Sequence, residues 1–462
     1  MPERRGDKII NGRIIMTERS YPEISVGIVS GKALTVTLNG EYNVSGGERS
    51  IKGQWTAAFS DGRVLLTGDG ASVQAGRELI LVPTDHLHCS FTLHAVTIGV
   101  AFHWERNEDQ TFVGKLKFMI IEGGVTAVNL VPVEDYLASV ISSEMSATSS
   151  VELLKAHAVI SRSWLLAQID KTARLEAGGE RYVAHQVSDR EIIRWYDRED
   201  HKEYDVCADD HCQRYQGITR ATTPEVESAV RETAGEVLMS GEALCDARYS
   251  KCCGGITELF ENVWEPVSHD CLQTVTDAAR PPEGFDMDLT TEENAVRWIR
   301  GNPEAFCNSD DRAVLAQVLN SYDQETNDFF RWKVIYRQEE LSALVKERTG
   351  IDFGMITDLE PLARGTSGRI IKLKITGDRK TMIIGKELEI RKALSTSHLY
   401  SSAFFVETED NEQGRSFILH GAGWGHGVGL CQIGAAVMGA SGFGYREILS
   451  HYFVHSVLQK IY

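Results

Sequence analysis

Two helical patterns follow one another in the segment VPVEDYLASVISSEMSATSSVELLKAHAVISRSWLLAQI, residues 131–169. Leu137, Val140 and Ile141 recur at the spacing of one helix face, which predicts a first helix over residues 134–145. A second helix is expected to begin after the serine pair at 149 and 150, because either side chain can cap its first turn. We therefore expect a helical pair packed against strands from later segments.

Toward the N-terminus the pattern changes to short alternating runs. Between Glu23 and about Lys117, apolar and polar residues alternate, as around Ile24 and Val26, and pairs such as Asn-Gly and Gly-Gly separate the runs. Alternation with tight turns is typical of strands joined by hairpins. Residues 1–110 are therefore predicted to form a β-rich N-terminal region.

Toward the C-terminus, irregular and regular segments follow each other. Residues 171–220 are charged and irregular, which indicates an excursion, and residues 280–330 are polar and partly helical, which indicates an insertion. Strand-like runs return over residues 331–407. We predict an α+β fold, in which the β-rich region precedes a mixed helix and sheet core over residues 111–462.

The composition is that of a folded globular protein. Of 462 residues, 42% are hydrophobic and 25% are charged, and the net charge of −18 argues against nonspecific binding to nucleic acid or to an anionic membrane. The N-terminal residues hold no apolar run of the length that an export signal needs. Residues 86–104 and 421–445 carry no charge but contain four histidines and nine glycines, respectively. We therefore expect neither an export signal nor a transmembrane segment.

Glu144 is the first candidate for chemistry. It lies seven residues after Leu137 and four after Val140, so it continues the apolar face of the first predicted helix. A carboxyl group against the core stays protonated more readily, which suits a general acid. The position equally suits a helix-terminal glutamate that pairs with a lysine or arginine, and spacing does not decide between the two.

Two cations share one face of the second predicted helix. Lys155 and Arg162 are seven residues apart, and near a glutamate they can bind an anionic sugar or a peptide carboxylate. The alternative is a solvated face that carries ordinary surface charge.

A cluster of cysteines and histidines offers metal ligands. The nine cysteines of the chain cannot all pair, and metal or thiol chemistry fits them better than a disulfide framework. His201, Cys207, His211 and Cys212 lie within twelve residues, and zinc prefers thiolate and imidazole ligands. A structural zinc ion is expected here, with His201, Cys207 and Cys212 as the firmer three ligands. The alternative is a set of reduced cysteines without a role.

The segment RYSKCCGGITE, residues 248–258, ends a strand-like run with two thiols and two glycines. Tyr249 and Ser250 are candidates for substrate binding. Cys253 offers a nucleophile that would need a histidine, although small side chains packed under a glycine turn explain the segment as well.

A glycine-rich segment, HGAGWGHGVGLCQIGA, covers residues 420–435. Its glycines match neither the dinucleotide nor the P-loop pattern. A loop that presents Trp424, His426 and Gln432 suits a sugar or peptide site. The alternative is a turn whose tryptophan and histidine pack into the core.

In this order, the segments VPVEDYLASVISSEM, LLKAHAVISRSWLLA, YSKCCGGITE, GWGHGVGLCQIGA and YREILSHYF resemble the bacterial SpoIID/LytB family of stage II sporulation protein D and amidase enhancer proteins. Sporulation-type members are peptidoglycan-cleaving lytic transglycosylases, and their catalytic glutamate, in the EM pair, maps onto Glu144. The family arginine maps onto Arg162. The zinc-binding loop of some members maps onto His201 to Cys212.

The sequence differs from the family pattern at several positions. Ser146 stands where the family typically has proline, and Cys252, Cys253 and Cys431 stand where serine is more common. The resemblance implies a place in the cell envelope or periplasm, although no export signal is visible in the sequence.

Two classes of function follow from the resemblance. As an enzyme, the protein would cleave between N-acetylmuramic acid and N-acetylglucosamine with Glu144 alone, giving 1,6-anhydro ends. As a noncatalytic enhancer, it would bind peptidoglycan and activate a cell-wall amidase. A third reading, a thiol hydrolase of Cys253 and His426, lacks a group that orders the pair. In the first two, the expected substrate-binding residues are Arg162, Lys155, Tyr249, Ser250, Trp424, His426 and Gln432.

Overall fold

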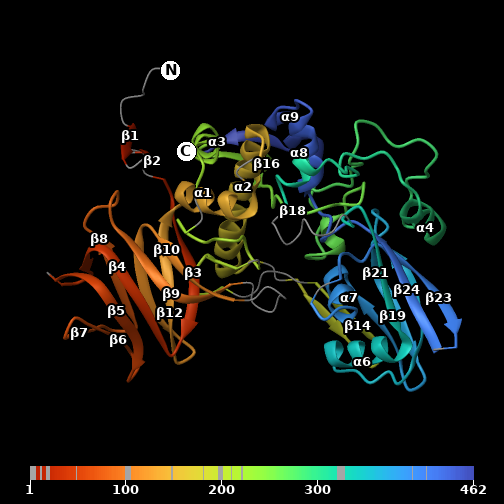
Figure 1. The fold of residues 1–462 in the computed structure, drawn as a ribbon, viewed down its shortest axis with the longest axis horizontal. Coiled ribbons are helices and arrows are strands. Elements are labelled where there is room, and N and C mark those ends of the chain that lie inside the picture. Colours follow the sequence, from red (N-terminus) through yellow and green to blue (C-terminus); the bar gives the residue numbers. More distant parts are fainter. Residues whose placement is uncertain are drawn as a thin grey trace. The chain divides into compact units, whose positions relative to one another are not determined.

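Most strands of the β-rich N-terminal region join one eleven-stranded sheet in the computed structural model (Figure 1). The order is β15-β3-β12-β11-β8-β4-β5-β6-β7, while β9 pairs with β4 and carries β10. Along β4, Leu34, Val36 and Leu38 are buried and their neighbours are more exposed, as alternation predicts. The strands are β3 (Glu23–Gly31), β4 (Ala33–Val44), β5 (Ser50–Ser60), β6 (Arg63–Gly68), β7 (Ala71–Gln74), β8 (Glu78–Pro83), β9 (Ser90–Ile98), β10 (Arg106–Phe112), β11 (Lys115–Ile121), β12 (Gly124–Pro132) and β15 (Val206–Cys207).

The chain divides into two units, and this sheet lies in the first. Unit 1 comprises Met1–Ala147, Asp200–Glu236 and Lys460–Tyr462, and unit 2 comprises Thr148–Glu199 and Val237–Gln459. The boundary expected near residue 110 stays a prediction about where the second domain begins. The structure describes residues 7–10, 13–16, 21–47, 49–98, 106–146, 149–179, 182–195, 201–209, 211–219, 222–319, 328–397, 399–412 and 414–462.

Two helices accompany the sheet of unit 1. Helix α1 (Val133–Glu144) follows β12 directly and contacts α3 (Pro224–Glu232), whose N-cap is Thr223. The stripe predicted from the sequence is confirmed, because Leu137, Val140 and Ile141 are fully buried. A separate hairpin consists of β1 (Asp7–Ile10) and β2 (Arg13–Met16).

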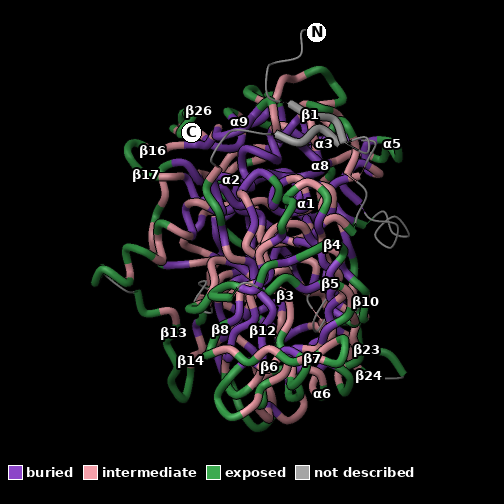
Figure 2. Tube along the Cα trace, turned by 90° about the vertical axis from the view of Figure 1, so that its left-hand side faces the viewer, coloured by how far each residue is buried: buried purple, intermediate pink, exposed green. Residues whose placement is uncertain are grey.

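Helix α2 (Val151–Glu176) is the longest helix that the structure describes, and it lies in unit 2. Of the two candidate caps, Ser150 is the one that binds, since its side chain accepts a hydrogen bond from the backbone N–H of Leu153. Helix α2 packs against α8 (Gln432–Ala440) and α9 (Tyr445–Tyr452). Most of its first seventeen residues are buried, and Figure 2 shows this stretch in purple.

Two sheets with two covering helices share one hydrophobic core in unit 2. The five-stranded sheet has the order β13-β14-β22-β21-β20, and the three-stranded sheet has the order β19-β24-β23. Helix α6 packs on β20, β19 and β24, and α7 packs on β21 and β22. These elements are β13 (His185–Val187), β14 (Glu191–Arg194), β19 (Arg331–Arg337), α6 (Gln338–Thr349), β20 (Ile356–Arg364), β21 (Ile370–Gly377), β22 (Thr381–Gly385), α7 (Glu387–Ala393), β23 (Phe404–Asn411) and β24 (Gly414–Ala422).

Shorter elements complete the chain. The segment expected to be an insertion holds α4, which packs on β23 and β24, and α5, which packs on α8. Strands β18 and β25 pair in parallel, and β16 pairs with β17 and β26. These elements are β16 (Glu236–Ser240), β17 (Ala243–Leu244), β18 (Tyr249–Ser250), a 3-10 turn at Phe260–Asn262, α4 (Glu292–Arg300), α5 (Arg312–Leu315), β25 (Leu430–Cys431) and β26 (Val457–Lys460).

The α+β prediction is confirmed by this mixture of helices and several sheets. The expected excursion at residues 171–220 instead supplies strands to two sheets, since β13 and β14 extend the sheet of unit 2 and β15 lies beside β3 in unit 1. No helix within the described ranges has the length and apolar character that crossing a membrane requires.

Candidate functional site

Glu144 is the last residue of α1, in unit 1. It ends the buried stripe but is itself only partly buried. Among the described residues of unit 1, no lysine or arginine pairs with its carboxylate and no hydrogen bond reaches it, and the last turn of α1 holds no basic residue. The ion-paired alternative therefore has no partner within this part of the unit, and the carboxylate is accessible for chemistry.

The two cations of α2 lie in different surroundings. Arg162 is fully buried, which rules out the solvated-face interpretation for this residue, and its Nη1 lies 3.4 Å from the carbonyl oxygen of Ala158. Lys155 is partly exposed, forms an ion pair with Glu152 at 3.4 Å and lies over the ring of Tyr445 at 5.8 Å. Binding of a substrate by either residue stays a prediction.

The two motifs of unit 2 meet at the pairing of β18 with β25. Tyr249 pairs with Leu430 and Ser250 pairs with Cys431, although about 180 residues separate the partners. The glycine-rich segment therefore lies beside the YSKCCGG segment. Ser250 is buried, and its hydroxyl has no hydrogen-bond partner among the described residues.

Both ring nitrogens of His426 are engaged within the loop. Nε2 donates to the carbonyl oxygen of Tyr249 at 2.9 Å, and Nδ1 accepts from the backbone N–H of Val428 at 3.0 Å. Burial first, and then the positive charges of Arg248 and other arginines, lower the pKa of His426 well below its ordinary value. The thiol-hydrolase reading is therefore wrong, because His426 has no free nitrogen with which to activate Cys253.

Gln432 is held by a residue that sequence reasoning missed. Its side-chain Nε2 donates to Nε2 of His157 at 3.2 Å, and Nδ1 of His157 lies 3.2 Å from the hydroxyl of Ser161. The ring of His157 also packs edge-on against Tyr249, with ring centroids 4.6 Å apart. The sequence did offer one signal for His157, because this polar residue stands between two alanines in an apolar part of the predicted helix.

Trp424 belongs to an aromatic group. Its ring stacks on Phe329 at 5.0 Å and meets Tyr400 edge-on at 5.8 Å, while the residue stays partly exposed. The tryptophan is thus held rigidly, and its remaining exposed surface can pack against the apolar face of a sugar.

Two buried charged residues, which the sequence did not single out, hold these segments. The guanidinium of Arg369 donates to the carbonyl oxygens of Cys253 and Gly425, at 3.2 and 3.1 Å. The carboxylate of Glu258 accepts hydrogen bonds from the backbone and side chains of Thr366 and Ser367. Both residues are 0% exposed, so they hold these segments from the protein interior and cannot contact a ligand.

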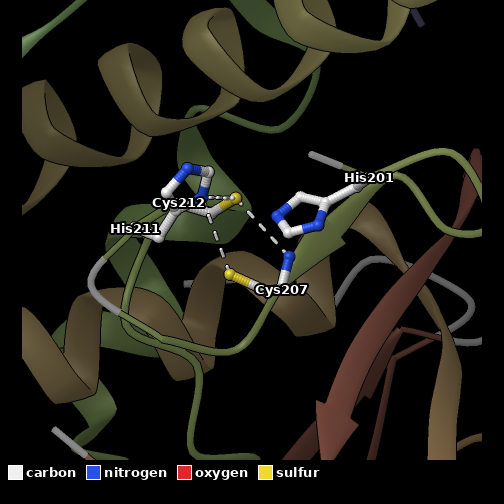
Figure 3. Close-up of side chains that lie close together, drawn as sticks. All are labelled: His201, Cys207, His211 and Cys212. Atoms are coloured by element: carbon white, nitrogen blue, oxygen red, sulfur yellow. Dashed lines mark hydrogen bonds between the residues drawn. The ribbon is translucent and has the colours of Figure 1, made fainter. Parts of the chain in front are cut away.

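The histidine and cysteine cluster of unit 1 forms as expected. The ligand atoms of His201, Cys207, His211 and Cys212 all lie within 4.8 Å of one another, and Figure 3 shows the four side chains facing each other. Sγ of Cys212 lies 3.5 Å from Nδ1 of His211 and accepts from the backbone N–H of Cys207. This group can hold a metal ion.

The chemistry of the cluster fits a cation. Nε2 of His201 is buried and has no hydrogen-bond partner among the described residues. The contact with Cys212, followed by burial, raises the pKa of Cys207 to about 11, so without a cation this thiol is neutral. Strand β15 fixes the loop to the edge of the sheet, where Asp205 accepts from the backbone and hydroxyl of Ser25 at 2.7 Å.

Two of the cysteines form a disulfide, although metal or thiol chemistry was expected to fit the cysteines better than a disulfide framework. Cys245 and Cys271, both in unit 2, are joined by a disulfide bond. Neither residue belongs to a recognisable pair in the sequence, because 26 positions separate them.

Comparison with known proteins places two family matches on the chain. Residues 121–239, which include α1, α2 and the histidine and cysteine cluster, match the family described as Stage II sporulation protein. Residues 258–429 match a domain of unknown function (DUF8618).

Two relatives are similar in sequence. An uncharacterized protein of Brachyspira hyodysenteriae is 26% identical over 344 residues, which cover 74% of this chain and 70% of that protein. The amidase enhancer of Bacillus subtilis is 25% identical over 247 residues, which cover 50% of this chain and 32% of that protein. The chain thus matches about a third of the length of the amidase enhancer.

Proposed function

We infer that this chain, which carries a domain of the SpoIID/LytB family at residues 121–239, acts on bacterial peptidoglycan as a lytic transglycosylase. The observation that carries the proposal is Glu144 at the end of α1, within the matched stretch. A partly buried carboxylate without an ion-pair partner in the described part of its unit is suited to give and take a proton.

A single carboxyl group suffices for this reaction. Glu144 donates its proton to the glycosidic oxygen as the bond from the anomeric carbon of N-acetylmuramic acid breaks. The 6-hydroxyl oxygen of the same sugar then bonds to that carbon and gives its proton back to Glu144, which restores the acid. No water is consumed, and the product carries a 1,6-anhydro ring.

Unit 2 supplies the proposed binding surface. The stacked ring of Trp424 offers a flat apolar surface, while the hydroxyl of Ser250 is buried and does not reach a ligand in this conformation. His426 and Gln432 use their polar groups within the fold, so we assign them to shaping the surface. Arg162, Lys155 and Tyr249 complete the proposed set.

Zinc is the proposed occupant of the cluster at His201, Cys207, His211 and Cys212. Two thiolates and two imidazoles are a ligand set of structural zinc sites, and four protein ligands leave no position for a catalytic water. The proposed role is to hold the loop that follows β15 in place, near α1. The side chain of Tyr136 on α1 contacts Gln213, one residue beyond the cluster.

The test replaces Glu144 by glutamine in the full chain. Glu144→Gln keeps the shape but removes the transferable proton, so release of anhydro-ended fragments from amidase-stripped peptidoglycan should fall by about 100-fold or more. Glu176→Gln is the matched control, because Glu176 is likewise the last residue of its helix but is exposed. Fragments are identified by mass spectrometry, and the melting temperature checks folding.

One outcome would overturn the enzyme and favour a second function. If Glu144→Gln releases anhydro products at the parent rate, the acid assignment fails. The similarity to the amidase enhancer supports the alternative of a noncatalytic protein that binds peptidoglycan and activates a cell-wall amidase. That function predicts no products from the purified protein alone, and faster stem-peptide release when an amidase is added.

A further inference from the structure

A second group of metal-ligand side chains lies in unit 2, away from the cluster of unit 1. The ligand atoms of Cys253, Asp277, Cys307 and Cys431 all lie within 4.8 Å of one another. Each of the four residues is 2% exposed or less. They come from four separate places in the chain, so no sequence motif announces them.

The spacing of the sulfur atoms fits one tetrahedral ion. Sγ of Cys253 lies 3.7 Å from Sγ of Cys307. Zinc–sulfur bonds of about 2.3 Å give a tetrahedron with edges of about 3.8 Å. The four cysteines around an iron–sulfur cluster are farther apart, because several metal atoms lie between them. Sγ of Cys431 also accepts from the backbone N–H of Cys253 at 3.2 Å, which favours a thiolate.

Asp277 is a buried carboxylate that forms no ion pair with any described residue. One oxygen accepts from the hydroxyl of Tyr452 at 2.5 Å, and the other accepts from the backbone N–H of Cys307 at 2.8 Å. The carboxylate fits beside Gly434 only because glycine has no side chain, since a Cβ at this position would lie 2.3 Å from Oδ1 of Asp277. A cation at the four ligand atoms would compensate the charge of this buried carboxylate.

We propose that Cys253, Cys307, Cys431 and Asp277 bind one zinc ion, in addition to the ion of the His201 loop. Zinc accepts both soft thiolate ligands and a hard carboxylate ligand, so three thiolates and one carboxylate can form a closed tetrahedral zinc site. Binding releases the thiol protons to solvent and involves no change of redox state. A disulfide between Cys253 and Cys307 would instead leave Cys431 and Asp277 buried without a cation.

The ion would brace the proposed binding surface. Cys253 lies three residues after Ser250, and Cys431 precedes Gln432 directly. Cys307 belongs to the segment between α4 and α5, so the ion would tie that segment to both motifs. The site is structural, and its existence does not depend on the glycan chemistry proposed for Glu144.

The test uses full-length protein in which Cys207 and Cys212 are both replaced by serine, which removes the thiols of the other cluster. Elemental analysis is expected to find one zinc per chain in this protein. Adding Cys307→Ser or Cys431→Ser should lose the ion. Adding Cys89→Ser is the matched control, because Cys89 is likewise a buried free cysteine but lies outside both groups of ligands, and it should keep the ion.

Cobalt binding gives a second measurement, which needs no substitution among Cys253, Asp277, Cys307 and Cys431. Cobalt bound to the doubly substituted protein should show thiolate-to-metal absorption in the near ultraviolet and the intense visible bands of a tetrahedral site. The proposal fails if this folded protein holds no zinc and gives no such cobalt bands, or if peptide mapping without reduction finds Cys253 disulfide-bonded to Cys307. Iron in place of zinc would overturn the assigned metal, and zinc retained after Cys307→Ser and Cys431→Ser would overturn the ligand set.

Discussion

His157 occupies surroundings that keep its imidazole neutral. Nε2 accepts a hydrogen bond from Gln432, so a proton cannot bind there without breaking that contact. Burial first, and then the positive charge of Lys251, lower the pKa of His157 from 6.5 to about 3. An unfolded chain carries no such constraint, so the two states differ in proton affinity.

We predict that this histidine makes the protein sensitive to acid. Because the folded pKa is depressed, the stabilisation is complete above about pH 6.5, and it is lost progressively as the pH falls from there toward about 3. His157→Gln keeps a donor and an acceptor but does not titrate. The slope of unfolding free energy against pH should therefore be smaller in the variant, by up to about 1.4 kcal/mol per pH unit.

Urea unfolding followed by tryptophan fluorescence measures this difference in unit 2. Six of the eight tryptophans belong to that unit, namely Trp164, Trp195, Trp264, Trp298, Trp332 and Trp424. His185→Gln is the control, since His185 is exposed on β13 and should leave the slope unchanged. Equal slopes for His157→Gln and the parent protein would contradict the prediction.

Packing restricts the sequence of the glycine-rich loop. Gly427 has a φ of 78°, which favours glycine, and a Cβ there would lie 2.4 Å from the guanidinium carbon of Arg369. The glycine pattern therefore serves close backbone packing. The sequence alone excluded a phosphate loop but did not reveal this reason, because Arg369 lies 58 positions earlier in the chain.

A matched pair of substitutions tests this interpretation. Gly427→Ala and Gly442→Ala both place a side chain at positive φ, but a Cβ at Gly442 would meet no atom within 4 Å. Gly442→Ala should cost about 1 kcal/mol of unfolding free energy. Gly427→Ala should cost about 2 kcal/mol more, because Arg369 must move. Equal losses in urea unfolding would show that Arg369 does not restrict the loop.

At the level of helices and strands, local patterns were sufficient for part of the structure. The stripe of α1 and the serine cap of α2 were predictable because both depend on residues within one or two turns. The hairpins of the N-terminal sheet were predictable for the same reason. The bonds of Glu258 to Ser367 and the approach of Asp277 to Cys431 were not, because they join segments more than 100 residues apart.

At the scale of the whole molecule, the chain leaves unit 1 after residue 147 and returns to it at residue 200. The returning segment holds the cluster of His201, Cys207, His211 and Cys212. The sequence predicted this ligand set because its members lie close together, but it did not predict the parallel pairing of β15 with β3, 180 residues earlier. The position of Glu144 in one unit and of Ser250 and Trp424 in the other also has no sequence signal.

The loop of unit 1 should respond to loss of its metal while unit 2 does not. Cys207→Ser together with Cys212→Ser should remove one zinc ion per chain and increase proteolysis between residues 201 and 212. Tryptophan fluorescence, which reports mainly on unit 2, should be unchanged. Cys89→Ser is the control, because Cys89 is a buried free cysteine of unit 1 outside both clusters. Unchanged zinc content in the double variant would show that Cys207 and Cys212 do not bind the metal and are reduced cysteines without a role.

The disulfide between Cys245 and Cys271 has a mechanical consequence. It closes a covalent ring that contains the YSKCCGG segment, because the two cysteines are 26 positions apart in the sequence. When the chain is pulled from both ends, the force passes through the sulfur–sulfur bond and not through the residues of the ring. The fully stretched chain is therefore shorter by about 90 Å than it would be without the disulfide. Tyr249 and Ser250 therefore carry no load, and their backbone can stay folded while the rest of unit 2 is stretched.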